Sequence, residues 1–311
     1  MIPPNQKPRA RGTLFATASV FLVCLGLFAA AEAQARTLYE KLAYGRLIII
    51  GTCLQQGWRA MIQVDEVLKG DLAAQRIQIA FRLQNFERSP GDPEIGFIVG
   101  ERAILVLEPD PMEGGDEKDV AVYGLSRGPE GKINIPAEGA EALLGAVRRM
   151  VRIQSLGDQN EVWEEQRQLL REVNPLLVET GFQQVLKFRL GNESLLPLLS
   201  RYLSHPRDSF RLDALRVLAQ IFDASRRRGE RLSESGTLIA EVLVIARGDT
   251  SAEVRAQAIR VLSVSGRGDL REFMQEVARS DPSQLVRYEA QRSLLELEAP
   301  APRPAGELSE R

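Results

Sequence analysis

Histidine and cysteine, the side chains that most often carry out nucleophilic or acid–base catalysis, are scarce in this chain. Its 311 residues include one histidine, His205, and two cysteines, Cys24 and Cys53. Ser-His-Asp and Cys-His catalysis need a histidine beside a nucleophile, whereas His205 stands next to Pro206 in an expected turn between helices. The same shortage excludes zinc sites built from histidine and cysteine. We therefore expect no enzymatic activity of these kinds and no cofactor.

Carboxylates are the remaining candidates for chemistry. One glycine-containing loop at residues 110–119 gathers five acidic residues: Asp110, Glu113, Asp116, Glu117 and Asp119. Calcium prefers oxygen ligands, but the spacing does not match an EF-hand, and a solvated acidic loop is the simpler interpretation. A carboxylate- or metal-dependent enzyme acting on an envelope glycan or peptide stays open as an alternative.

Arginines form a second candidate site. Residues 201–231 contain eight arginines and four acidic residues, an excess of four positive charges that could attract an acidic protein, glycan or lipid headgroup. Three of the arginines, Arg226, Arg227 and Arg228, lie in a polar segment that we interpret as an inserted loop. The alternative to ligand binding is a solvated loop whose charges are neutralised by nearby helices. Because the whole chain has a net charge of −2 and no basic tail, nucleic-acid binding is not expected.

The elements that would position these arginines follow from a pattern that occurs three times. Its copies start at His205, Asp249 and Asp281, so it returns after 44 and then 32 positions. In each copy a turn residue precedes apolar residues at helical spacing, with a small alanine among them. Preceding helices are expected at 195–203, 238–246 and 270–278. Repeats of this length are typical of helix pairs that stack to bury their apolar faces.

Over residues 193–297 the chain resembles the HEAT-repeat family. That family carries an aspartate in the turn between helices and an arginine six residues later, which form a ladder between neighbouring repeats. Asp249 with Arg255 and Asp281 with Arg287 match both residue types and the spacing. The first copy keeps Arg211 but has His205 in place of the aspartate, which puts its rung in doubt. The resemblance implies an α-solenoid that binds a protein partner.

One arginine recurs five residues after each ladder arginine. These residues are Arg216, Arg260 and Arg292. We expect them on the concave face of the stack, exposed for contact with a partner.

The amino-terminal part of the chain has a different pattern of apolar and polar residues. Apolar and polar residues alternate at residues 58–65 and 77–82, and the apolar run 103–107 indicates a strand buried on both faces. Weaker strands are expected at 120–125 and 132–135. The sequence predicts a small antiparallel β-barrel over residues 36–136, which resembles the OB and TIMP-like extracytoplasmic barrels. TIMP-like inhibition needs an amino-terminal cysteine, and the expected mature start, Arg36, is not one.

The chain begins with a targeting pattern. Basic residues precede an apolar run at residues 14–31, and Ala33-Gln34-Ala35 follows as a cleavage site. We expect a signal peptide over residues 1–35, cleaved after Ala35, and an extracytoplasmic (periplasmic or secreted) protein. An uncleaved anchor is the alternative, and it would make the protein a membrane-tethered envelope assembly factor.

The remaining segments complete a multidomain α and β organisation. Residues 137–192 are expected to form connecting and capping helices, residues 193–297 the HEAT-like repeats, and residues 298–311 a disordered tail. The sequence thus favours an exported, non-enzymatic scaffold or adaptor that binds another protein.

Overall fold

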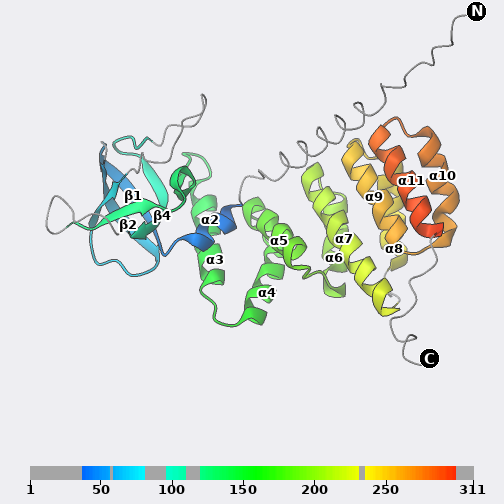
Figure 1. Ribbon diagram of the computed structural model, residues 1–311, viewed down its shortest axis with the longest axis horizontal. Coiled ribbons are helices and arrows are strands. Elements are labelled where there is room, and N and C mark those ends of the chain that lie inside the picture. Colours follow the sequence, from blue (N-terminus) through cyan, green and yellow to red (C-terminus); the bar gives the residue numbers. More distant parts are fainter. Residues whose placement is uncertain (1–36, 57–58, 81–95, 110–119, 231–234, 299–311) are drawn as a thin grey trace, which may run out of the picture.

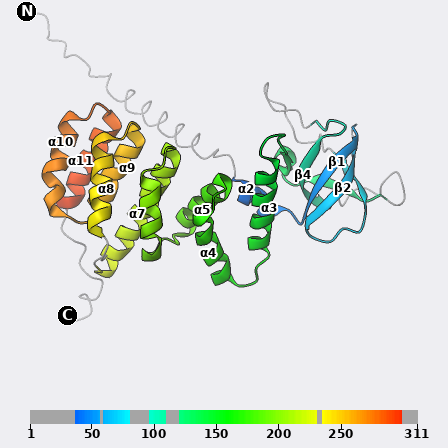
Figure 2. The ribbon, with the colours of Figure 1, turned by 180° about the vertical axis from the view of Figure 1, so that it is seen from behind.

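A computed structural model describes residues 37–56, 59–80, 96–109, 120–230 and 235–298. These residues contain a small closed five-stranded β-barrel and ten α-helices, nine of which follow the barrel. The molecule is elongated, with the barrel at one end, α8–α11 at the other, and α3–α5 between them (Figure 1, Figure 2). The expected signal peptide, acidic loop and tail lie outside the described residues.

The barrel is built from five strands, and all but the first lie in segments where the sequence predicted strands. They are β1 (Leu47–Gln55), β2 (Arg59–Lys69), β3 (Arg76–Ala80), β4 (Arg102–Pro109) and β5 (Val122–Leu125). Their order is β1-β2-β3-β5-β4, pairing of β1 with β4 closes the ring, and β6 (Lys132–Asn134) adds to β4. The expectation of a wholly antiparallel barrel is wrong, because β3 and β5 are parallel. A closed ring with an odd number of strands cannot alternate direction throughout.

Strands β1 and β4 are buried on both faces, as the sequence predicted for β4. Their inward side chains, among them Ile49 and Leu105, fill the barrel. Their outward side chains pack against α2 (Leu38–Tyr44) and α3 (Ala140–Gln154). Because successive strand residues point to opposite faces, a continuous apolar run is what such a strand requires. The outward set is Ile48, Ile50, Ile104 and Val106.

The connecting helices join the barrel to the helical region. They are α4 (Gln159–Gln168) and α5 (Pro175–Phe188), separated by a short 3₁₀ turn at Leu169–Arg171. Within that turn, Leu169 packs into the cluster around α2 and α3, whereas Leu170 packs into the cluster of the later helices. Neighbouring residues of one turn therefore serve two apolar cores.

Three helix pairs form the far end of the molecule. They are α6 (Leu196–Leu203) with α7 (Asp208–Arg228), α8 (Ser235–Gly248) with α9 (Ala252–Val264), and α10 (Arg271–Ser280) with α11 (Gln284–Glu298). The second helices pack side by side, α7 on α9 and α9 on α11. Their recurring alanines are fully buried, and a single apolar cluster runs through all three pairs. Those alanines are Ala214, Ala258 and Ala290.

One boundary differs from the expectation. The basic segment that we interpreted as a loop continues α7 as far as Arg228, and the helix ends at Gly229 in the left-handed conformation. Ser225, which appeared to start the loop, is buried against the core. The arginines after it lie in the last helical turn, where positive charge interacts favourably with the helix dipole.

Candidate functional site

The arginines and aspartates of the repeated pattern meet between successive helix pairs. Arg211 donates from Nε and Nη2 to the two carboxylate oxygens of Asp249, at 2.8 and 2.9 Å. Arg255 makes the same forked contact with Asp281, at 3.0 Å for both bonds. Both pairs are nearly buried, with side-chain exposures of 13% and 7% in the first and 10% and 9% in the second. Two of the expected ladder contacts therefore exist as bidentate ion pairs.

The ladder joins each arginine to the aspartate of the following unit. The third guanidinium nitrogen, Nη1, binds the arginine to its own turn, through His205 O for Arg211 and Asp249 O for Arg255. The rung doubted for Arg211 is therefore complete, since it needs Asp249 and not a carboxylate at position 205. The His205 ring accepts a bond from the Arg207 amide at 3.1 Å and packs on the Phe210 ring.

Electrostatics favour the charged form of both partners in the second rung. Burial opposes ionisation of Asp281, but hydrogen bonds from Arg255 and the Ser283 amide outweigh it and hold the pKa of Asp281 below its ordinary value. The hydrogen bond to Asp281 in turn raises the pKa of Arg255.

The second set of arginines lies at equivalent positions on α7, α9 and α11, and its side chains reach solvent. The exposed fractions are 50% for Arg216, 42% for Arg260 and 36% for Arg292. Arg216 pairs with Asp213 at 3.0 Å, while Arg260 and Arg292 approach Glu289 at 3.6 and 2.9 Å. The row is therefore a strip of paired charges rather than free cations.

The carboxylates of Asp213 and Glu289 are less exposed to solvent than the arginines that they pair with. Burial raises the pKa of Asp213 and of Glu289 above their ordinary values, against the opposing effects of the neighbouring arginines. An acidic ligand that bound this strip would have to compete with Asp213, Glu289 and Glu296, the last of which lies 3.3 Å from Arg292. The i,i+3 spacing of Asp213 with Arg216 and of Glu289 with Arg292 is a local signal of this pairing, whereas the contact of Arg260 with Glu289 joins two helices.

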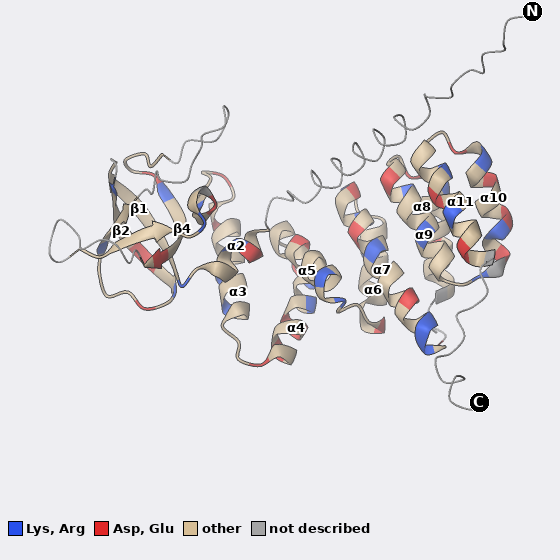
Figure 3. Cartoon of the chain, in the orientation of Figure 1, with Lys and Arg blue, Asp and Glu red and all other residues tan. Residues whose placement is uncertain are grey.

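The basic end of α7 is a separate candidate. Arg227 pairs with Asp223 at 2.5 Å and Arg228 with Glu230 at 2.6 Å, whereas Arg226 has no ion pair within the described part of the chain. Positive and negative residues are interspersed over the helices, with a basic cluster at this end of α7 (Figure 3).

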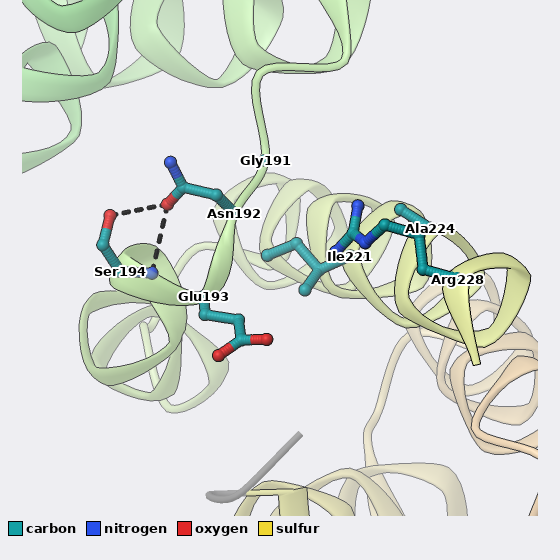
Figure 4. Close-up of a pocket in the computed structure, with 7 residues that line it drawn as sticks. All are labelled: Gly191, Asn192, Glu193, Ser194, Ile221, Ala224 and Arg228. Carbon is teal, nitrogen blue, oxygen red and sulfur yellow. Dashed lines mark hydrogen bonds between the residues drawn. The ribbon is translucent and has the colours of Figure 1, made fainter. Parts of the chain in front are cut away.

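A cavity of about 330 Å³ opens beside that helix end. Its polar groups are largely engaged: Asn192 Oδ1 accepts bonds from the amide and hydroxyl of Ser194 (Figure 4). Arg228 is paired with Glu230. Seven residues line it: Gly191, Asn192, Glu193, Ser194, Ile221, Ala224 and Arg228.

Two other features are absent from the described residues. No group of three or more histidine, cysteine or acidic side chains is placed to hold a metal ion among them. Nor does that part of the chain contain a helix with the length and apolarity needed to cross a bilayer. Comparison with protein-family models, with curated proteins and with solved structures finds no match for this chain.

Proposed function

We propose that this protein is a non-enzymatic scaffold that binds another protein through a stack of HEAT-like helical repeats. The observation that carries the proposal is the Arg211–Asp249 and Arg255–Asp281 ladder, which joins successive helix pairs through the same forked contact. A bidentate contact repeated in register is a feature of stacked repeats, and such stacks offer extended surfaces for partners.

The side of the stack formed by α7, α9 and α11 is the proposed binding face. These helices pack on one another in sequence, whereas contacts between α8 and α10 are sparse, so the second helices lie on the inner side of the curve. Arg216, Arg260 and Arg292 belong to these helices and expose 36–50% of their side chains, which supports their place on the proposed face. A partner that supplied carboxylates at the same spacing would replace Asp213 and Glu289 as counter-ions.

The topology of the front barrel supports an OB-like assignment. Its strand order, with β1 paired to both β2 and β4 and β3 parallel to β5, is that of OB barrels. The targeting pattern in residues 1–35 predicts that the protein is exported. Amino-terminal sequencing of the processed protein tests it, because a membrane-tethered form would retain these residues.

The binding face is tested with variants of the arginine row. Partners crosslinked in the native compartment are identified by mass spectrometry and then titrated with purified protein. Replacing all three arginines with alanine should weaken binding by about tenfold or more. A variant with three lysines keeps the charge but cannot make bidentate contacts, so its affinity should lie between those of wild type and the alanine variant. Unchanged affinity in the alanine variant would refute the assignment. The Arg226/Arg227/Arg228 alanine variant serves as the matched test of the other basic cluster.

A further inference from the structure

The outer face of α11 lacks the cover that the same face has on the preceding helix. On α9, which packs against α11, Ala256, Ile259 and Ser263 share one side of the helix and are buried, with exposures of 6%, 0% and 1%. The residues 32 positions later on α11 include Tyr288 and Leu295, with exposures of 62% and 68%. The third, Gln291, is exposed as well. The repeat therefore places a docking face at α11 that no described segment covers.

The ladder is incomplete at the same place. Arg287 donates from Nη1 to its own turn carbonyls, Asp281 O at 2.6 Å and Pro282 O at 3.1 Å, as Arg211 and Arg255 do in theirs. Its Nε and Nη2 have no partner among the described residues, although the equivalent atoms of Arg255 hold the carboxylate of Asp281. Three arginines thus face two aspartates, which leaves one positive charge at this end.

We propose that the outer face of α11, formed by Arg287, Tyr288, Gln291 and Leu295, docks a helical hairpin of a partner protein whose inter-helix turn carries an aspartate. The occupant follows from the chain itself. The α10–α11 hairpin covers the equivalent face of α9 and brings Asp281 to Arg255, and the α8–α9 hairpin brings Asp249 to Arg211. This surface is separate from the inner arginine row and does not depend on it.

A second copy of this chain is a poor occupant of this face. Its turn aspartates, Asp249 and Asp281, are already held by Arg211 and Arg255. The remaining inter-helix turn of the repeats presents His205, which has no carboxylate to offer to Arg287. The repeats of a second copy therefore offer no free turn aspartate, which favours a carboxylate from a different protein.

The fit of the face is tested by adding a hairpin of known chemistry. A second copy of residues 265–298 is inserted between Glu298 and Ala299, which leaves the natural chain intact. Hydrogen exchange at α11 should slow by about tenfold or more, and Arg287→Met in the extended chain should remove the effect. An Asp-to-Asn change in the added turn should do the same. Exchange rates equal to those of the natural chain, or unaffected by Arg287→Met, would overturn the proposal.

The natural partner is sought with a photo-crosslinking residue at position 288 of the full chain in the cells that produce it. Position 244, where Val244 is 72% exposed on α8, is the matched control. The expected adduct joins position 288 to a helix of another protein next to an acidic residue, and falls about tenfold in the Arg287→Met background. The proposal fails if position 288 gives no adduct beyond that of position 244, or if the crosslinked peptide comes from this chain itself.

Discussion

Removing Asp281 should destabilise the helical region more than removing any surface carboxylate. In the Asp281→Ala variant the Arg255 fork loses both bonds and remains nearly buried, with only 10% of its side chain exposed. Loss of one partner of a buried ion pair typically costs about 3–5 kcal/mol, because the remaining charge is desolvated without compensation. With a urea m-value of about 2 kcal/mol/M, the unfolding midpoint should fall by about 2 M.

The assay is urea unfolding followed by far-ultraviolet circular dichroism, which reports the helices. Asp223→Ala is the matched control, because it removes the partner of Arg227 from an exposed pair and should cost less than about 1 kcal/mol. The double variant Arg255→Met with Asp281→Leu should be more stable than Asp281→Ala, because it leaves no unpaired charge. Equal costs for Asp281→Ala and Asp223→Ala would show that the ladder does not hold the helix pairs together.

Three further predictions concern acid stability and the barrel end. The pKa of Asp281 is lowered in the folded protein. The stability that its charged form contributes is therefore complete above the ordinary pKa of about 3.9 and is lost as pH falls through the lower folded value. The difference in urea midpoint between wild type and Asp281→Asn should close in that acid window. Tyr39→Phe removes the hydroxyl that accepts from buried Gln166 at 3.2 Å and should cost about 1 kcal/mol, measured by thermal unfolding. Gly131→Ala would place a methyl group 2.7 Å from Ser126 O and should cost about 1–3 kcal/mol, with Gly145→Ala, which meets nothing within 4 Å, as its control.

Local patterns predicted most of the secondary structure because they record which face of an element is buried. The apolar run 103–107 predicted a strand covered on both faces, and β4 has that burial. The capping box of Thr37 and Glu40 is a local signal of the same kind, and it starts α2. Gly229 was a comparable signal for the end of α7.

Contacts between distant segments could not be predicted in the same way. The parallel pairing of β3 with β5 joins residues more than 40 positions apart and follows from ring closure, not from any local pattern. The spacing of Asp249 and Arg255 indicated a ladder, but it did not show that each arginine binds the aspartate of the following unit. The pairing of Arg260 with Glu289 likewise depends on how two helices are set against each other.

The double burial of β1 and β4 bears on how this molecule can be divided. A fragment that stopped at residue 136 would lose α3 and leave an apolar strip on the barrel wall open to water, and such strips promote self-association. A soluble barrel fragment should therefore extend at least through Gln154, whose side chain also binds the Tyr39 carbonyl at 2.9 Å. Any exchange of this barrel between proteins would have to carry α2 and α3 with it. The strip consists of Ile48, Ile50, Ile104 and Val106.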